Sequence, residues 1–371
     1  MKKEKIKNIQ KRNYGIDLLR IIAMLMIVTL HMLGLGGVLN SAEQLSLHYN
    51  VGWLIEIAAF CGVNCYALIS GYVSVGAKYK YHKIITLWFQ VVFYTILVSI
   101  CYMLKYPGTV GKETWIRDLF PVITGEYWYF TAYVALFFCI PFLNYLLNTM
   151  ERRKIEKLLV SCIVLFSLIP TIVCRDVFYL QSGYSFVWLI VLYLIGGYLK
   201  IYRIEDQISK KKSFAIYFLC IIVTWIVKIA AESFLPGVTK SVPINNTLIS
   251  YTSPTMLLAG ITLFLSFVNL KIEKDFVKKA IGILGASSFS VYLIHTHSLS
   301  CQILNGRFSS YAGGSVLNLI VLTIVFPIML YLICTAVDVV RAKLFVILKI
   351  DCFSQGIWGK ITKIWEKISL K

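Results

Sequence analysis

Long apolar stretches alternate with short, mostly basic segments along almost the whole chain. A helix of ~20 apolar residues is long enough to cross ~30 Å of hydrocarbon. Ten stretches of that kind can be marked, covering residues 14–36, 51–75, 84–104, 127–148, 157–174, 185–201, 213–233, 251–270, 280–303 and 315–343. The first continues into a regular multi-span pattern, so we do not expect a cleaved signal peptide. The pattern predicts an all-α fold, a polytopic membrane helix bundle of about ten transmembrane helices.

Composition and charge agree with a membrane protein. Apolar residues make up 58% of the 371 residues and charged residues only 15%, which is too little polar surface for a soluble globule. The net charge is +19. With the N-terminus placed inside, 29 of the 37 Lys and Arg residues lie on inner segments and 6 on outer loops. This bias predicts that both termini are cytoplasmic. The positive charge then serves to orient the protein and to attract lipid headgroups rather than to bind nucleic acid.

The same pattern divides the chain into three parts. We expect a basic cytoplasmic lead over residues 1–13, a transmembrane domain over 14–345 and a basic, interfacial cytoplasmic tail over 346–371. Residues 105–126 and 234–250 form the long external loops. The ten cysteines are scattered and show no metal-ligand spacing, so no metal site is expected.

The first apolar stretch carries the most unusual polar residues. Arg20 and His31 are eleven residues apart, which is about three helical turns plus ~20°, so both project from one face ~16 Å apart along the axis. Asp17 can pair with Arg20 at i,i+3. An arginine inside a bilayer costs ~2.5–3.5 kcal/mol on insertion scales, so a function is the default hypothesis. A purely structural role, in which such polar residues bridge helices, is the alternative.

A second polar concentration lies in residues 287–298 of the ninth stretch. Tyr292 and His295 share a helix face at i,i+3, whereas His297 would point about 160° away from His295. Only one of the two histidines can then face a common cavity. Because stretches one and nine both run outward, His31 and His295 are both expected in the outer half of the membrane.

Two further groups of residues can be explained by structural roles alone. The aromatic residues that begin the fourth stretch, from Tyr127 to Tyr133, fit an interfacial belt better than a sugar platform. Lys228 and Glu232 form an i,i+4 pair at the outer end of the seventh stretch, where snorkelling and pairing suffice.

Taken together, these residues resemble acyltransferase family 3, integral membrane enzymes that O-acylate cell-surface polysaccharides. The stretch IDLLRIIAMLMIVTLH resembles the family's R-x10-H signature, with Arg20 and His31 at its fixed positions. Further similar segments are ISGY at 69–72, YWYFTAYVALFFCIPFLN at 127–144, YLIGGYLK at 193–200 and SFSVYLIH at 288–295. Members commonly carry arginines just after the ISGY segment, where this chain has Lys78, Lys80, His82 and Lys83.

The resemblance implies a substrate pair and a location. The donor would be cytoplasmic acyl-CoA, usually acetyl-CoA, bound as a co-substrate rather than as a tightly held cofactor. The acceptor would be a hydroxyl of a polysaccharide or lipid-linked sugar. The lysines Lys78, Lys80 and Lys83 would take the donor-binding role of the arginines, as point charges without the bidentate fork. We expect a multi-pass protein of a cell membrane, from a bacterium.

Histidine chemistry suits this reaction. A sugar hydroxyl is a poor nucleophile while protonated, and histidine is the base whose ordinary pKa fits neutral pH. His31 is the candidate, either as general base or as acyl carrier. Arg20 suits a donor phosphate, with Asp17, Tyr292 and His295 in support. The competing hypotheses are a transporter or flippase for a sugar or amino acid, and a non-catalytic partner of a polysaccharide synthase.

Overall fold

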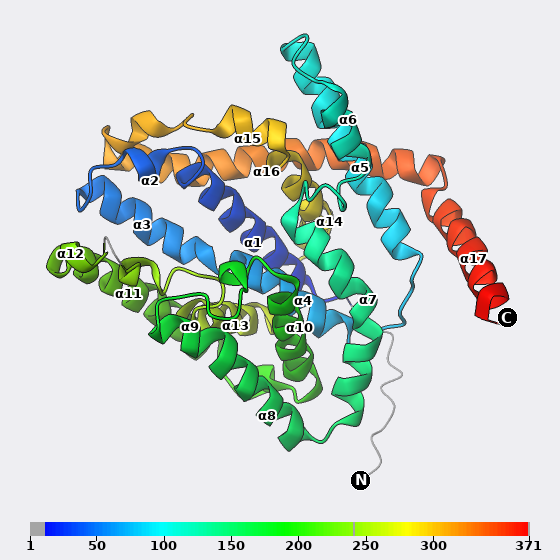
Figure 1. The fold of residues 1–371 in the computed structure, drawn as a ribbon, viewed down its shortest axis with the longest axis horizontal. Helices are drawn as coiled ribbons and strands as arrows, with labels where there is room; N and C mark the ends of the chain where they lie inside the picture. The colour runs from blue at the N-terminus through cyan, green and yellow to red at the C-terminus, as the bar shows by residue number, and fades with distance from the viewer. Residues whose placement is uncertain (1–11, 240–241, 370–371) are drawn as a thin grey trace.

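The computed structural model describes residues 12–239 and 242–369, which form helices joined by turns, with no β-strand in these two ranges (Figure 1). Most of the predicted basic lead, residues 1–11, and the last two residues of the tail lie outside the described residues. The predicted all-α helix bundle is confirmed.

The helices have the following bounds, η1 being a π-helix and the other η elements 3₁₀-helices: α1 (Tyr14–Leu33), α2 (Val38–Ser41), α3 (Leu47–Phe60), α4 (Gly62–Ser74), α5 (Lys83–Lys105), α6 (Lys112–Leu119), α7 (Trp128–Thr149), α8 (Arg152–Ile163), η1 (Val164–Leu168), α9 (Ile169–Ile172), η2 (Gln181–Gly183), α10 (Phe186–Ile201), η3 (Ile204–Asp206), α11 (Lys210–Phe234), α12 (Pro236–Thr239), η4 (Ile244–Asn246), α13 (Pro254–Val268), α14 (Asp275–His295), α15 (Ser298–Leu304), η5 (Ser309–Ala312), α16 (Val316–Ile347) and α17 (Ile350–Ser369).

All ten predicted stretches are helical, and they differ in length. Eight helical segments in the described ranges are long and apolar enough to cross a membrane, namely Tyr14–Ser41, Leu47–Ser74, Lys83–Lys105, Trp128–Thr149, Arg152–Ile172, Lys210–Phe234, Asp275–His295 and Val316–Ile347. The other two predicted stretches are the shorter apolar helices α10 and α13. How many of the ten cross the bilayer, and which side faces the cytoplasm, stay predictions.

Local sequence explains where these helices begin. The side chains of Asn13, Ser46, Ser185 and Ser253 each accept a hydrogen bond from a backbone N–H of the first turn, at the starts of α1, α3, α10 and α13. Such caps satisfy donors that have no partner within the helix, which matters most where water is scarce.

Small residues let the central helices approach closely. An added Cβ at Gly71 of α4 would overlap the carbonyl of Tyr193 in α10, and one at Gly196 would overlap the carbonyl of Leu68. An added Cβ at Gly285 of α14 would lie 3.1 Å from the Cβ of Asp17 in α1, a tight contact without overlap. This packing mode is typical of membrane helices, where apolar lipid removes the usual hydrophobic drive for association. It also brings α1, which carries His31, into contact with α14, which carries His295.

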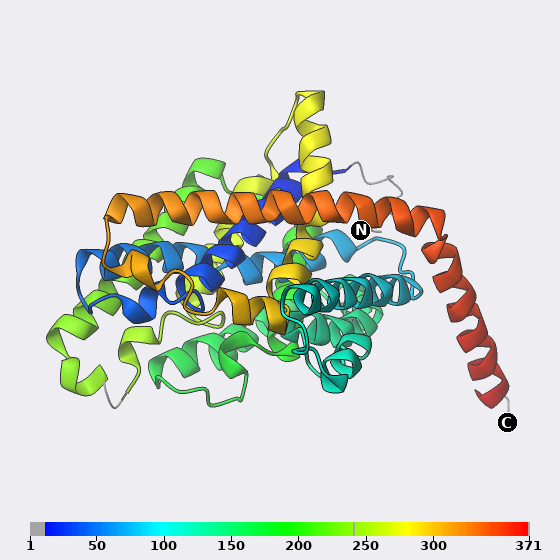
Figure 2. The ribbon, with the colours of Figure 1, turned by 90° about the horizontal axis from the view of Figure 1, so that it is seen from above.

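The outer surfaces of the long helices are apolar, as lipid contact requires. α11 exposes Phe218 and Ile226, and α16 exposes Leu332 and Ile333, each more than half accessible. Figure 2 shows α16 lying along the length of the molecule and α17 bending away from the bundle at its end. The Lys83–Asp351 ion pair and the stacked rings of Tyr81 and Trp358 connect α17 to the start of α5.

One predicted span is interrupted. The ninth stretch was expected to be helical over 280–303, but α14 ends at His295 and a new helix, α15, begins at Ser298. His297 is the N-cap residue of α15, and its side chain accepts a hydrogen bond from the backbone of Leu299. The predicted 160° relation between the two histidines on a single helix is therefore wrong, because the helix stops before His297.

Candidate active site

His31 and His295 contact each other across the α1–α14 interface. Nδ1 of His31 lies 2.9 Å from Nε2 of His295, and the ring centroids are 5.1 Å apart. Nδ1 of His295 in turn lies 2.6 Å from the carbonyl oxygen of Val291, one helical turn back. The sequence predicts that both histidines lie in the outer half of the membrane. In the structure, the packing of α1 on α14 brings them into direct contact.

This chain of contacts fixes which nitrogen carries each proton. A carbonyl oxygen only accepts, so Nδ1 of His295 must carry the hydrogen and donate it to Val291. The Nε2 atom of a neutral His295 then accepts from the Nδ1–H of His31. The remaining nitrogen of His31, Nε2, is left unprotonated with a free lone pair, which is the form that a base or nucleophile requires.

His31 lines a small aromatic cavity of ≈ 50 Å³. Apart from Met24, Ile27 and Val63, its walls are aromatic and come from five different segments: Tyr66, Trp128, Tyr129, Tyr184, Tyr251, Phe289 and Tyr292. Ligand sites usually measure ~300–1,000 Å³. These rings must therefore move apart before a ligand of that size can reach His31.

The aromatic lining corrects one expectation and supports another. Trp128 and Tyr129 were expected in an interfacial belt, but both line the His31 cavity, and Tyr127 beside them is 1% exposed. The belt hypothesis fails because these rings face neighbouring helices rather than headgroups. Tyr292 lines the same cavity and its ring lies 6.5 Å from that of His295, as their shared helix face predicts.

Arg20 lies in a second, open cavity of ≈ 440 Å³ toward the N-terminal end of α1. Its guanidinium donates to Asp17 over 2.6 Å, which confirms the predicted i,i+3 pair. Arg12 donates to the other oxygen of the same carboxylate over 2.6 Å. Lys200, at the end of α10, also lines the cavity, and its ammonium lies 4.6 Å from the centre of the Tyr72 ring.

Arg12, Arg20 and Lys200 therefore place three cations around one carboxylate, Asp17, in this cavity. Such an excess of positive charge suits a ligand with phosphate groups. Sequence reasoning missed Arg12 and Lys200. The one available signal was that Lys200 ends the YLIGGYLK segment and, like Arg12, was predicted to lie on the inner side.

Tyr66 stands between the two cavities. Its ring lines the His31 cavity, and its hydroxyl donates to the backbone carbonyl of Arg20 over 2.6 Å. Arg20 and His31 are eleven positions apart on one helix, or ~16 Å. A path along this face of α1 from one cavity to the other passes Tyr66.

The lysines after the ISGY segment lie elsewhere. Lys78 and Lys80 are exposed, and Lys83 donates to Asp351 of α17 over 2.7 Å. That hydrogen bond holds the pKa of the Asp351 carboxyl below its ordinary value. None of the three lysines lines the cavity of Arg20. Their donor-binding role stays a prediction.

His297 belongs to a separate buried cluster. Its Nε2 lies 3.1 Å from Asp118 and 3.6 Å from Glu126, and Arg117 pairs with Glu126 over 3.0 Å. These contacts join the predicted external loop 105–126 to the junction of α14 and α15. They support a structural role for His297. Neither His295 nor His297 lines the His31 cavity, and His295 is connected to it through its contact with His31.

Comparison with known proteins identifies the family to which the chain belongs. A family model described as an acyltransferase domain matches residues 13–338, most of the chain and all the residues of both cavities except Arg12. The comparisons with curated proteins and with solved structures each gave no match. The chain thus belongs to acyltransferase family 3 and is a membrane acyltransferase.

Proposed function

We propose that this protein transfers an acyl group, in particular acetyl, from cytoplasmic acyl-CoA to a hydroxyl of a cell-surface or lipid-linked sugar. The observation that carries the proposal is the free Nε2 of His31, created by the His31–His295–Val291 contacts at the wall of an aromatic cavity. Aromatic rings are suited to hold a sugar because they are apolar on their faces and, in Tyr and Trp, polar at one end.

The proton moves through His31 in this mechanism. The acceptor hydroxyl gives its proton to Nε2 of His31 while its oxygen attacks the carbonyl carbon of the thioester. The C–S bond then breaks, the acyl group stays on the sugar oxygen, and the CoA thiolate takes the proton from His31. The hydrogen bond from Nδ1 of His31 to His295 stabilises the imidazolium between these two steps.

The same nitrogen also allows a covalent route. Nε2 of His31 would attack the thioester itself and release CoA, and the sugar hydroxyl would then attack the acyl-imidazole. Both routes need an unprotonated Nε2, and both end with an ester and free CoA.

The cavity lined by Arg12, Arg20 and Lys200 is the proposed binding site of the donor. Arg20, Arg12 and Lys200 would bind phosphates of CoA, and the ~16 Å between Arg20 and His31 is comparable to an extended pantetheine arm. The thioester would then lie beside His31. Asp17 holds the guanidinium of Arg20 in place from the same helix face.

The test is a transfer assay on the purified protein in lipid vesicles. Acetyl-CoA labelled in the acetyl group is supplied with carbohydrate extracted from the envelope of the source cells. We expect alkali-labile label on the carbohydrate and none with His31→Ala. Movement of sugar across the vesicle without consumption of acetyl-CoA would instead identify a transporter, and transfer that persists in His31→Ala would refute the assignment of His31.

A further inference from the structure

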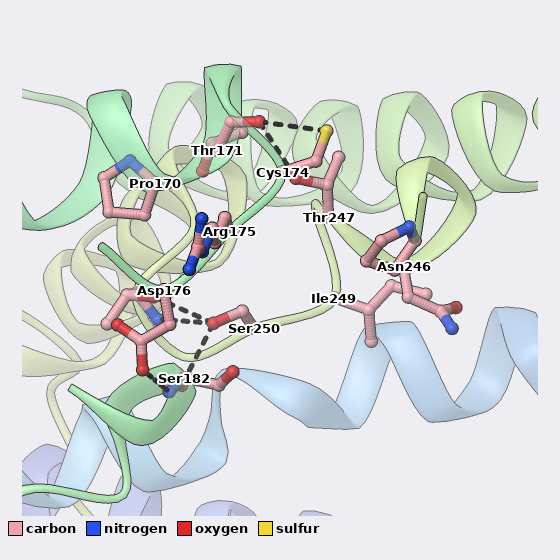
Figure 3. A pocket seen from close by; sticks show the side chains of 12 residues that line it. Pro170, Thr171, Cys174, Arg175, Asp176, Ser182, Asn246, Thr247, Ile249 and Ser250 are labelled. Atoms are coloured by element: carbon pink, nitrogen blue, oxygen red, sulfur yellow. Dashed lines mark hydrogen bonds between the residues drawn. The ribbon is translucent and has the colours of Figure 1, made fainter. Parts of the chain in front are cut away.

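A third cavity, of ≈ 260 Å³, lies between two loops on the predicted outer side (Figure 3). One loop joins α9 to α10 and the other joins α11 to α13. We call this cavity the outer groove; its lining is Pro170, Thr171, Cys174, Arg175, Asp176, Ser182, Pro243, Asn246, Thr247, Ile249, Ser250 and Thr252. Neither the family assignment nor the proposed chemistry uses it.

Hydrogen bonds fix the two loops against each other. Thr247 donates from its hydroxyl to the carbonyl of Thr171 over 3.0 Å, and Ser250 donates to the carbonyl of Ser182 over 3.0 Å. The Asp176 carboxylate accepts from the backbone N–H of Leu180 over 2.9 Å. The groove is therefore a built feature rather than a gap between mobile loops.

A buried ion pair anchors one wall of the groove. Lys228 and Glu232 of α11 pair over 2.5 Å with both side chains 1% exposed, so the pairing expected from sequence is confirmed and the snorkelling is wrong. Asn245 donates to Glu232 over 2.9 Å, and Lys228 donates to the side chain of Asn246 over 3.2 Å. A buried pair needs such extra hydrogen bonds to offset its desolvation, and here they come from the groove loop.

The opposite wall holds a strained backbone. Cys174, Tyr179, Gln181 and Ser182 all have φ between 50° and 55°, in the left-handed region that side chains disfavour. Such residues persist only where the surrounding structure determines them, and they cluster at ligand sites. Four in nine residues mark this loop as shaped for a purpose other than connecting two helices.

The groove chemistry fits a carbohydrate that carries negative charge. Hydroxyls of Ser182, Thr247 and Ser250 and the amide of Asn246 lie along it, the mixed donors and acceptors that sugar hydroxyls need. Arg175 is exposed, and its guanidinium has no hydrogen-bond or ion-pair partner among the residues that the structure describes. Its planar fork matches a carboxylate or phosphate.

The outer groove and the His31 cavity share a wall. Ser250 and Thr252 line the groove, while Tyr251 between them lines the His31 cavity. Ser182 lines the groove, and Tyr184 two residues later lines the cavity. The rings of Tyr184 and Tyr251 lie 4.9 Å apart, and that of Trp128 lies 4.6 Å from Tyr184. These three rings form the partition between the two spaces.

We propose that the outer groove binds the acceptor, a carbohydrate bearing a carboxylate or phosphate, and that it reaches His31 when Trp128, Tyr184 and Tyr251 move apart. This inference rests on the proposed acyl transfer and adds where its acceptor binds. The groove binds the part of the carbohydrate next to the reacting sugar, and Arg175 binds its carboxylate or phosphate.

A native cysteine allows a test without knowledge of the acceptor. Cys174 lines the groove and is partly exposed, whereas Cys101 is exposed on α5 and absent from the groove. Intact cells are treated with the membrane-impermeant thiol reagent sulfonatoethyl methanethiosulfonate. Two quantities are then measured: the initial rate of acetyl transfer to the cells' own surface carbohydrate, and acetyl-CoA binding by the protein purified after treatment.

We expect the reagent to remove most of the transfer rate, dithiothreitol to restore it, and acetyl-CoA binding to stay unchanged. Treated Cys174→Ser should transfer at the same rate as untreated Cys174→Ser, while Cys101→Ser stays sensitive to the reagent. Unchanged transfer with Cys174 fully labelled overturns the proposal, as does an equal loss of acetyl-CoA binding. Absence of transfer in untreated cells refutes acyl transfer itself, so the two failures are distinguishable.

A charge substitution tests the anionic group. Arg175→Gln should lower the transfer rate at limiting acceptor about tenfold, the loss expected for one charged hydrogen bond. Arg307→Gln is the matched control, since Arg307 is also exposed on the predicted outer side and lies outside the groove. Equal rates for the two variants would overturn the assignment of a negatively charged acceptor.

Discussion

The Nε2 atom of His295 lies 2.9 Å from Nδ1 of His31, while the other nitrogen of His295 is committed to the Val291 carbonyl. His295 can therefore act only as an acceptor toward His31, and this orients the free lone pair of His31. In the proposed mechanism the two histidines therefore have different roles, His31 at the reacting atoms and His295 as a positioning residue.

Substitutions at the two histidines should separate these roles. We expect His31→Ala to lower the transfer rate at least about 10²–10⁴-fold, the usual contribution of a general base, without loss of folded protein. His295→Gln retains an acceptor for the Nδ1–H of His31 and should transfer faster than His295→Leu, which has none. Initial rates at saturating acetyl-CoA measure the difference. Equal rates for the Gln and Leu variants would remove the positioning role.

The cation-lined cavity predicts an effect on donor binding. Arg20→Lys keeps the charge but loses the bidentate fork, so we expect the KM for acetyl-CoA to rise about tenfold with little change in kcat. Lys200→Gln should act in the same direction. The control is Lys80→Gln, an exposed lysine outside the cavity. A larger effect at Lys80 than at Arg20 would move the donor site to the turn after α4.

The sequence alone predicts those relations between site residues that lie on a single helix. The 3.6-residue period alone predicts that Arg20 and His31 share a face, that Asp17 pairs with Arg20 and that Tyr292 and His295 project together. Such relations depend on rise and angle within one element. They could be derived before any contact between helices was known.

The relations between helices could not be derived in that way. Lys200 and Arg12 meet beside Arg20 because the C-terminal end of α10 lies by the N-terminal end of α1. Tyr184 and Tyr251 reach His31 from loops far apart in the chain. The position of Trp128 could not be predicted because an aromatic residue at a helix end has the same sequence signal in a belt and in a cavity wall. Only the packing around it decides which of the two it forms.

The glycine contact between α4 and α10 predicts a stability effect. An alanine at Gly71 would force its methyl group into the backbone of Tyr193, and overpacking of this kind costs ~1–3 kcal/mol or more. We expect Gly71→Ala to lower the thermal denaturation temperature in detergent. Gly111→Ala, where an added Cβ meets nothing within 4 Å, should not. Equal denaturation temperatures would mean that the helices can separate at this point without loss.

A substitution at Tyr66 should separate donor binding from acyl transfer. Its ring lies between the Arg20 and His31 cavities, so the larger ring in Tyr66→Trp should obstruct the pantetheine path. We expect acetyl-CoA to bind normally while transfer falls well below that of Tyr66→Phe, which keeps the ring size and loses only the hydroxyl. Binding is measured with labelled acetyl-CoA and transfer by label on carbohydrate. Equal transfer by both variants would place the donor arm elsewhere.

The positions of Arg20 and His31 on α1 make a final prediction about sidedness. Arg20 is less than two turns from the N-terminal end of α1, which is predicted to be cytoplasmic, and His31 is in the last turn. We therefore expect a donor bound at Arg20 to come from the cytoplasm, and the acyl group to cross most of the bilayer inside the protein and meet an acceptor from the other side.

Oriented vesicles test this arrangement. We expect inside-out vesicles to use externally added acetyl-CoA and right-side-out vesicles to require it inside, with a membrane-impermeant carbohydrate acceptor active only from the opposite face. A cysteine placed at Lys210, which is predicted to be cytoplasmic, reports the orientation of each preparation through labelling with an impermeant reagent. Acylation only when donor and acceptor share the cytoplasmic face would overturn transfer across the membrane. His31 could still be the base in that case, because the direction from which the acceptor arrives does not change the chemistry at its Nε2.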